Sequence, residues 1–401
     1  MGKLMGNMLI AQSGGPTVVI NQSLVGAIIE GKKHSEIKEI YGSLYGIKGI
    51  LDGNLVDLRR EKLSDLKKVA LTPCAALGSV RKKPTIEECE EIFKNMQRYN
   101  IRYFFYIGGN DSAETAFILN ENAKKVGYEF KCFHIPKTID NDLKENDHTP
   151  GYGSAGKFVA MAIMGDNLDN KSLPGVKIDV IMGRHAGFLT AASSLARIYE
   201  DDGPHLIYLP ERPFIIEKFL KDVGEIYEKY GRCLVAVSEG ISDENGEPIA
   251  AKFTKEVDAH GNVQLSGTGA LGDLLADIVK KELKISRVRA DTFGYLQRSF
   301  PGVYSEVDAK EAYKVGELAV KYAIKYESGS VAIKREKGEK YKVYYEPVSL
   351  QLVARETRSM PDEFINEDSN WVTEKFIKYA KPLVGKLPEI GRLKNYRISK
   401  G

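Results

Sequence analysis

Short runs of apolar residues alternate along the chain with longer stretches that have helical periodicity. Residues 8–11 precede a helical stretch over residues 18–33, and residues 178–182 precede one over residues 186–199. Continuous apolar runs of this length are typical of parallel strands buried on both faces, with helices as the crossovers. Runs of the same kind cover residues 103–107, 130–135, 205–209 and 233–237. The pattern predicts an α/β protein with mostly parallel sheets.

Two polar stretches interrupt this alternation. Residues 242–267 contain the turn signals Asn245-Gly246 and Gly261-Asn262, and we expect an excursion of hairpins there. Residues 325–345 are dense in Lys, Glu and Tyr, which predicts a solvated strand pair. Both stretches are therefore expected at the surface of the protein.

Length, charge and cysteine usage narrow the class of protein. The chain has 401 residues, which at about 100–200 residues per domain predicts two or three domains. Its net charge of +3 is too small for a dedicated nucleic-acid binder. No run reaches about 18 apolar residues, so we expect no membrane span. The four cysteines lack metal-binding spacing and are expected as free thiols of a cytoplasmic protein.

Glycine, hydroxyl and charged side chains follow most of the apolar runs. In open parallel sheets, ligands bind outside the carboxyl ends of the strands, where these side chains would gather. Any single loop of this composition can be explained as a turn, because Gly, Asn and Asp favour turns. Charges of both signs at several strand ends instead favour a shared ligand site.

Two glycine-rich loops have the composition of phosphate-binding loops. Ser13-Gly14-Gly15-Pro16 joins a strand to a helix, and its amides could converge on a phosphate at the positive end of the helix dipole. Gly108-Gly109-Asn110-Asp111-Ser112 repeats this arrangement, and glycine there lets the backbone approach a ligand closely. Two such loops on neighbouring strands predict that the protein binds phosphate.

A third glycine pattern does not qualify as a nucleotide motif. Gly151, Gly153 and Gly156 have the dinucleotide-binding spacing, but residues 146–150 before them do not form a strand pattern. Lys157 would complete a triphosphate-binding loop, yet Phe158 stands where Ser or Thr must hold magnesium. We interpret this segment as the tight start of a helix whose amides face the same crevice.

Two carboxylates, Asp140 and Asp142, lie beside the expected phosphate site. Such a pair could divide magnesium binding and proton abstraction between its members, although both residues could also be helix or turn caps. Lys137, at the same strand end, supplies a cation. Phosphoryl transfer needs charge neutralisation on the moving group and a base for the attacking hydroxyl. These residues therefore indicate phosphoryl-transfer chemistry.

The motifs of the chain, taken in order, resemble those of the phosphofructokinase family. They are Ser13-Gly14-Gly15, Leu77-Gly78-Ser79-Val80-Arg81, Gly108-Gly109-Asn110-Asp111-Ser112, Pro136-Lys137-Thr138-Ile139-Asp140-Asn141-Asp142, Met182-Gly183-Arg184 and Gly294-Tyr295-Leu296-Gln297-Arg298. The resemblance extends over residues 8–315. It implies phosphoryl transfer to the 1-hydroxyl of fructose 6-phosphate. It also implies two facing Rossmann-like domains with the active site in the cleft between them.

For this chain the resemblance implies domains that are discontinuous in sequence. The donor domain, for pyrophosphate and Mg²⁺, is expected to comprise residues 1–150 and roughly residues 297–345. The sugar-phosphate domain is expected to comprise residues 151–296 and roughly residues 346–401. A homodimer or homotetramer is also expected, because one ligand of the sugar phosphate would come from a neighbouring subunit.

The resemblance assigns a role to each matching residue. Asp140 would bind the substrate and take the proton from its 1-hydroxyl, Lys137 would screen the transferred phosphoryl group, and Arg184 would stabilise developing charge. Asp142 would hold magnesium, together with Asn110 or Asp111. The other residues implied on the sugar-phosphate side are Thr138, Met182, Gly183, Glu239, Tyr295 and Arg298, with Arg289 from the neighbouring subunit. Those implied on the donor side are Gly14, Gly15, Arg81, Gly108, Gly109 and Ser112.

Asp111 and Lys137 bear on the choice of phosphoryl donor. ATP-using members of the family typically have glycine at both positions, although some of them also have the lysine. A carboxylate at Asp111 fills space and repels the α-phosphate of a nucleotide, so it would exclude ATP. Lys137 offers a charge-assisted partner to compact, highly charged pyrophosphate. The chain therefore resembles the pyrophosphate-dependent branch, with pyrophosphate and fructose 6-phosphate as expected substrates and Mg²⁺ as cofactor.

Three other functions stay open at the level of sequence. They are an ATP-dependent 6-phosphofructokinase, a pyrophosphate enzyme that acts on sedoheptulose 7-phosphate, and a catalytically silent regulatory subunit. The presence of Asp140, Asp142 and Arg184 argues against the silent subunit. Asn110 departs from the family pattern, because many relatives have Asp there. His185, which follows Arg184, is interpreted as a packing residue, and we expect no nucleic-acid or membrane partner.

Overall fold

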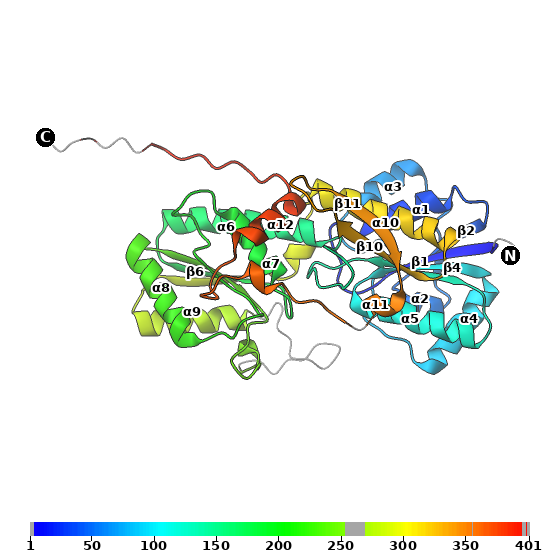
Figure 1. Ribbon diagram of the computed structural model, residues 1–401, viewed down its shortest axis with the longest axis horizontal. Helices are drawn as coiled ribbons and strands as arrows, with labels where there is room; N and C mark the ends of the chain where they lie inside the picture. The colour runs from blue at the N-terminus through cyan, green and yellow to red at the C-terminus, as the bar shows by residue number, and fades with distance from the viewer. Residues whose placement is uncertain (1–3, 253–268, 355, 395–397, 399–401) are drawn as a thin grey trace.

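The strands of the protein form two sheets of different size. The computed structural model describes residues 4–252, 269–354, 356–394 and 398, and within them one sheet has seven strands and the other has four. Figure 1 shows these sheets side by side along the long axis, each with helices packed against it. We call them the larger and the smaller sheet. The predicted α/β class is confirmed.

The larger sheet has a parallel centre and antiparallel edges. Its strands are β1 (Gly6–Gln12), β2 (Ile37–Ser43), β3 (Leu55–Asp57), β4 (Ile101–Gly108), β5 (Lys131–Pro136), β10 (Gly329–Arg335) and β11 (Val343–Val348). In space they follow the order β11-β10-β5-β4-β1-β2-β3. The pairings from β10 to β2 are parallel, whereas β11 and β3 pair antiparallel at the two edges.

The smaller sheet is parallel throughout. Its strands are β6 (Val176–Ile181), β7 (Leu206–Tyr208), β8 (Cys233–Ser238) and β9 (Val288–Thr292). They follow the order β7-β8-β6-β9, so that β9 forms an edge. The expectation of mostly parallel sheets is therefore confirmed in both sheets.

Helices cover both faces of each sheet, which explains the continuous apolar runs. Met8 and Ile10 of β1 cluster with α1 (Ile20–Gly31) and α10 (Glu306–Lys325). Leu9 and Ala11 cluster with α4 (Ile86–Arg98) and α5 (Asn110–Lys125) on the opposite face. The smaller sheet lies between α8 (Ile216–Tyr230) and α9 (Ala270–Leu283) on one face and α6 (Tyr152–Ser172) and α12 (Glu374–Val384) on the other. Shorter helices are α2 (Ile47–Leu51), α3 (Leu63–Ala70), α7 (Phe188–Ala191), α11 (Leu350–Val353) and the 3₁₀ helices η1 (Ala192–Ala196), η2 (Ile249–Lys252), η3 (Gly294–Arg298) and η4 (Asp362–Phe364).

The two polar stretches differ from expectation in part. Residues 325–345 do contribute an antiparallel pair, β10 and β11. However, β10 is not solvated, because Val331, Ala332 and Ile333 are buried where the strand joins the sheet beside β5. In the excursion, Ser242 and Pro248 form an antiparallel bridge, and residues 253–268 lie outside the described residues.

The start of α6 corrects the interpretation of the third glycine pattern. The backbone N–H of Gly151 donates to Oδ1 of Asp308 at 2.8 Å, and that of Ser154 donates to Oδ2 of the same carboxylate at 2.9 Å. These amides therefore face Asp308 instead of the crevice. The tight helix start is present, but a carboxylate of α10 fills the place of an anionic ligand.

No helix within the described residues is both long enough and apolar enough to cross a membrane.

The larger sheet includes β11, which ends at Val348, and α11 packs on α5. α12 packs on α6. The division of the chain into a donor and a sugar-phosphate domain stays a prediction.

Candidate active site

A cleft of about 430 Å³ lies between the ends of strands from both sheets. Most of its lining residues follow the carboxyl ends of β1, β4 and β5 in the larger sheet and of β6 and β8 in the smaller sheet, and the others are residues 80–82, Arg298 and Thr357. Of the residues predicted from sequence, the structure gathers here Gly14, Gly15, Arg81, Gly109, Asn110, Asp111, Ser112, Lys137, Thr138, Asp140, Asp142, Met182, Arg184, Glu239 and Arg298. Residues predicted to bind the donor and residues predicted to bind the sugar phosphate thus share one cavity.

The two glycine-rich loops meet their helices differently. Gly109 is the N-cap of α5, so the positive end of that helix lies at the cleft. Gly14 instead lies well before α1, which begins at Ile20. Its φ is +73°, and its N–H donates to the carbonyl of Val80 at 3.1 Å. The amide of Gly14 is therefore engaged within the protein, contrary to the prediction that it faces a phosphate.

Cationic side chains crowd together in the cleft. Lys137 is 3% exposed, and its ammonium donates to the carbonyl of Gly15 at 2.6 Å. A Cβ on Gly15 would lie 2.5 Å from Nη1 of Arg298 and 3.9 Å from Nη2 of Arg81. Burial, with repulsion from Arg298 and Arg81, lowers the pKa of Lys137 to about 7. Because the positive charges of these side chains repel one another, a bound polyanion that neutralises them would be stabilised here.

Asp140 and Asp142 place carboxylates beside these cations. The backbone N–H of Asp140 donates to Oγ1 of Thr138 at 3.1 Å, which fixes the start of the loop. Burial raises the pKa of the Asp140 carboxyl, and the neighbouring arginine and lysine oppose this rise. Burial and the charge of Asp140 together raise the pKa of Asp142. The two carboxylates are thus poised to accept a proton or a cation.

Asn110 and Asp142 form the part of the cleft that suits a divalent metal. Nδ2 of Asn110 donates to Oδ2 of Asp142 at 3.2 Å. Oδ1 of Asn110 is buried and has no hydrogen-bond partner among the described residues. A carboxylate and an amide oxygen are hard ligands of the kind that Mg²⁺ accepts. The carboxylate of Asp111 is engaged by Lys83 at 2.9 Å, so we favour Asn110 over Asp111 as the partner of Asp142.

The ends of β6 and β8 hold the residues of the opposite wall. Gly183 has a φ of +138°, which favours glycine, and its carbonyl accepts a hydrogen bond from Oγ of Ser238 at 2.6 Å. A Cβ on Gly240 would lie 2.0 Å from the carbonyl oxygen of Arg184, so the two loops touch because that residue is glycine. Glu239 lies between these contacts and is 6% exposed. Arg184 and Glu239 are therefore held side by side.

Two predicted residues lie outside the cleft of their own chain. Arg289 is exposed on β9, and its Nη1 donates to the carbonyl of Val288 at 2.9 Å. Tyr295 in η3 is 49% exposed and stacks under the guanidinium of Arg298 at 4.7 Å. It lines a second cavity, of about 400 Å³, together with Asp291. Two further predicted site residues, Gly108 and Gly183, are not among the lining residues of the cleft and contribute backbone at the ends of β4 and β6.

Sequence reasoning missed residues that the fold brings to the cleft. His185, interpreted as a packing residue, is exposed and lines the cleft. Thr357 lines it from the C-terminal segment, to which no site residue had been assigned. Thr357 belongs to no motif and stands far from the other site residues along the chain, so no local signal could have indicated it. For His185, its position directly after Arg184 was the available signal.

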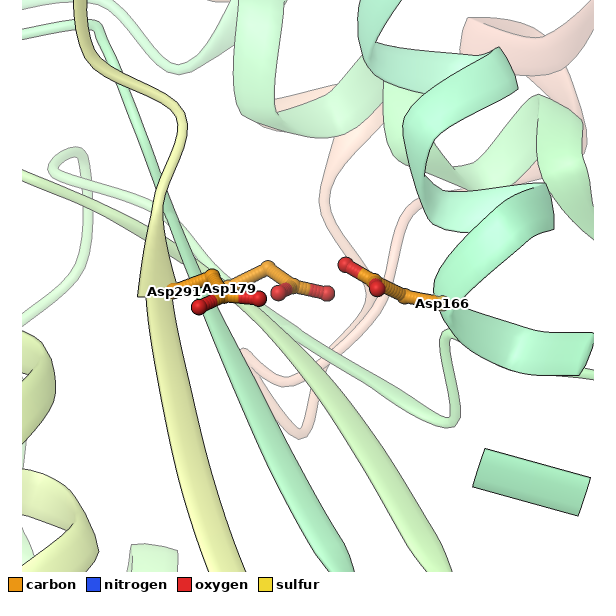
Figure 2. A group of neighbouring side chains, drawn as sticks. All are labelled: Asp166, Asp179 and Asp291. Atoms are coloured by element: carbon orange, nitrogen blue, oxygen red, sulfur yellow. The ribbon is translucent and has the colours of Figure 1, made fainter. Parts of the chain in front are cut away.

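A group of carboxylates lies apart from the lining of the cleft. Asp179 and Asp291 are opposite each other on β6 and β9, and Asp166 of α6 faces them (Figure 2). The ammonium of Lys177 lies 3.7 Å from Asp166 and 4.0 Å from Asp179, and it also pairs with Asp291. Lys177 is thus the cation of this cluster, and a metal would have to displace it. We assign no metal to these carboxylates.

Comparisons with known proteins agree with this arrangement. A pyrophosphate–fructose 6-phosphate 1-phosphotransferase of Rhodospirillum rubrum is 55% identical over 399 residues, 98% of each chain. One from Xanthomonas campestris is 36% identical over 415 residues, again 98% of each chain. The crystal structure of pyrophosphate-dependent phosphofructokinase from Marinobacter aquaeolei matches with a TM-score of 0.85 at 33% identity, covering 99% of this chain and 98% of its own. Because the phosphofructokinase family model also matches residues 7–323, the chain belongs to the phosphofructokinase family and has its α/β fold.

Proposed function

We propose that this protein transfers a phosphoryl group reversibly from pyrophosphate to the 1-hydroxyl of fructose 6-phosphate, giving fructose 1,6-bisphosphate and phosphate. The observation that carries the proposal is the crowding of Lys137, Arg81 and Arg298 around Gly15. Relatives that cover 98% of the chain are named for this reaction. Pyrophosphate is only slightly more energetic than the product ester, so the enzyme should work in both directions.

Pyrophosphate fits the donor side of the cleft better than a nucleotide does. It is compact and carries its charge within reach of Lys137, Arg81 and the N-terminus of α5. Asp111, in the first turn of α5, adds negative charge and volume on the same wall. The α-phosphate of a nucleotide bound in place of pyrophosphate would extend beyond the space that pyrophosphate fills and would meet this carboxylate. Exclusion of ATP is thus proposed as the role of Asp111.

Asp140 is proposed as the proton acceptor for the 1-hydroxyl. Burial raises the pKa of its carboxyl, which suits a general base, and the adjacent cations oppose this rise. Arg184, on the opposite wall, would stabilise the charge that develops on the transferred group. The residues proposed to bind the sugar phosphate are Thr138, Met182, Gly183, Glu239, Tyr295 and Arg298, with Arg289 of a neighbouring copy.

A divalent metal belongs to this chemistry, and we propose that it is Mg²⁺. Bound in the cleft, it would neutralise charge on the phosphoryl group that moves. Asp142 would hold it through a carboxylate oxygen, and the unpartnered Oδ1 of Asn110 would be its second protein ligand. Waters and donor oxygens would complete its coordination, as is usual for Mg²⁺.

We further propose a cytoplasmic homodimer or homotetramer. The four cysteines are free thiols, all within the described residues, which suits a reducing compartment. Arg289 lies exposed on the edge strand β9, where it could reach a neighbouring copy. Most of the proposed donor residues follow strands of the larger sheet, whereas Met182, Gly183, Arg184 and Glu239 on the sugar-phosphate side follow strands of the smaller one, which supports the proposed pair of domains.

The proposal is tested by supplying the purified enzyme with pyrophosphate, Mg²⁺ and one sugar phosphate at a time. We expect phosphate release and a bisphosphate product with fructose 6-phosphate. An equal kcat/KM with sedoheptulose 7-phosphate would extend the acceptor class, and a preference for it would replace the proposed acceptor. Inertness with both sugars, with ATP as well as with pyrophosphate as donor, in an enzyme that still binds fructose 6-phosphate would identify a silent subunit instead.

A further inference from the structure

A residue of the C-terminal segment, outside the cleft, is hydrogen-bonded to the loop that carries Asp140 and Asp142. We propose that Arg358 is a positioning residue for phosphoryl transfer: it fixes the backbone between Asp140 and Asp142 and so aims both carboxylates. Arg358 is not among the residues that line the cleft, and it acts through the loop. This inference rests on the proposed function for its kinetic consequences, but its structural claim can be measured separately.

Arg358 makes four hydrogen bonds to the backbone of this loop. Its Nε donates to the carbonyl of Asn141 at 2.8 Å, and its own backbone N–H donates to the carbonyl of Asp142 at 2.8 Å. Nη1 donates to the carbonyl of Asn146 at 2.7 Å, and Nη2 donates to that of Asp147 at 2.6 Å. One side chain thus ties both ends of the loop together.

The loop needs this support because Asn141 has an unfavourable backbone conformation. Its φ is +60°, in the left-handed region, and its side chain is completely buried. Nδ2 of Asn141 donates to the hydroxyl of Tyr379 at 2.7 Å, and Oδ1 accepts the backbone N–H of Thr149 at 3.0 Å. A strained residue of this kind persists when its surroundings determine it from several directions. Arg358 and Tyr379 supply those directions.

The geometry requires arginine in particular. Nε, Nη1 and Nη2 of Arg358 reach three different carbonyls, which a planar fork of donors can do and a single ammonium cannot. The guanidinium lies 4.9 Å from the centre of the Phe188 ring, which limits its orientation. Tyr379 also supports the loop, because its hydroxyl donates to the carbonyl of Asp147 at 2.7 Å.

The path of the chain explains how a distant residue arrives there. After α11, which packs on a helix of the larger sheet, the chain passes the loop and continues to α12 on the smaller sheet. Thr357 pairs with Leu143 in an antiparallel bridge as it passes, which brings Arg358 against the loop. The C-terminal segment therefore belongs to the catalytic architecture.

The kinetic test compares Arg358→Ala, Arg358→Lys and Tyr379→Phe with the wild-type enzyme. A carboxylate displaced by about 1 Å can lower turnover about 100-fold, so we expect kcat to fall by about 10–100-fold in Arg358→Ala, with KM for fructose 6-phosphate within about twofold. Added guanidinium ion at low, non-denaturing concentration should restore part of kcat. Arg392→Ala removes a surface arginine that pairs with Asp201 and Asp202, and it should change neither kcat nor the response to guanidinium. Unchanged kcat in Arg358→Ala, or a loss that arises wholly in KM, would overturn the proposal.

The structural test is hydrogen exchange followed by mass spectrometry of the same proteins. The backbone N–H of Thr149 reports on the contacts of Arg358 and Tyr379 with the loop, because it donates to Oδ1 of Asn141. We expect this amide to exchange at least about tenfold faster in Arg358→Ala and in Tyr379→Phe, with no change in α4. Unchanged exchange would overturn the proposal even if the wild-type enzyme proved inactive with pyrophosphate, a result that would itself refute only the proposed function. If Arg358→Ala fails to fold, Arg358→Lys and Tyr379→Phe decide by the same two measurements.

Discussion

The carboxylate of Asp111 lies 2.9 Å from the ammonium of Lys83, which also holds Glu114 at 2.6 Å. Asp111 is thus engaged on the donor wall of the cleft by a cation that is itself partly exposed, so the pair is weak and can be rearranged. If the carboxylate of Asp111 were removed, Lys83 would be left beside the position proposed for the α-phosphate of a nucleotide. Lys83 therefore bears on how readily the donor could be changed.

Asp111→Gly should permit measurable use of ATP, because it removes both the volume and the negative charge that oppose an α-phosphate. The double variant Asp111→Gly/Lys83→Ala should use ATP less well, because the α-phosphate then lacks its cation. The measurement is kcat/KM for ATP and for pyrophosphate in each variant. Glu114→Gln, which alters the other partner of Lys83, is the control and should leave ATP inert. If Asp111→Gly also leaves ATP inert, the discrimination resides elsewhere, with Lys137 as the first alternative.

Asp140→Ser should lower turnover by about 10²–10⁴-fold, the range for loss of a general base. Binding of fructose 6-phosphate, measured by calorimetry, should stay close to that of the wild-type enzyme, because the walls that hold the sugar remain. Near-normal turnover in this variant would remove Asp140 from the role of proton acceptor.

The affinity for pyrophosphate should fall as the pH rises above about 7. The folded protein holds the pKa of Lys137 at about 7, below its ordinary value of 10.5, chiefly through burial. The ammonium is therefore present below this pH and lost above it, so KM for pyrophosphate should rise by up to about tenfold per pH unit. In Lys137→Met this rise should disappear, leaving only the ionisation of pyrophosphate itself, whereas Lys334→Met, which affects a lysine paired with Glu145, should behave as the wild type. Identical pH curves for wild type and Lys137→Met would contradict this assignment.

Inactive variants of Arg289 and Asp140 should complement each other if Arg289 acts across a subunit boundary. Equal mixing of Arg289→Ala and Asp140→Ser subunits gives hybrids in which one site has both residues intact, so about a quarter of wild-type activity should return in a dimer. Exchange of subunits must be verified, for example by native mass spectrometry of differently tagged chains. No recovery in verified hybrids would place Arg289 outside the site.

The parts of the fold that could be predicted are those with a local physical signal. β1 and β4 were recognisable because both faces of each strand are buried, which gives them the continuous apolar runs 8–11 and 103–107. β9 was missed because Arg289 and Asp291 interrupt its apolar pattern at the sheet edge. β10 was predicted as solvated from its polar neighbourhood, although Val331 and Ile333 are buried in the core of the larger sheet.

The site shows the same division. Residues that directly follow buried strands, such as Asp140 and Arg184, were found because strand ends of parallel sheets converge. Asp308 could not be matched to the start of α6, because its sequence neighbourhood says nothing about which helix it caps. Thr357 reaches the cleft through the long C-terminal path of the chain, which only tertiary packing determines.

The most direct test of the central claim is a competition between donors in one solution. The wild-type enzyme receives fructose 6-phosphate, Mg²⁺ and equal concentrations of pyrophosphate and ATP, and ³¹P NMR follows both donors over time. We predict that pyrophosphate is consumed while fructose 1,6-bisphosphate and phosphate accumulate, and that ATP stays intact. Conversion of ATP to ADP with pyrophosphate unchanged would contradict the account.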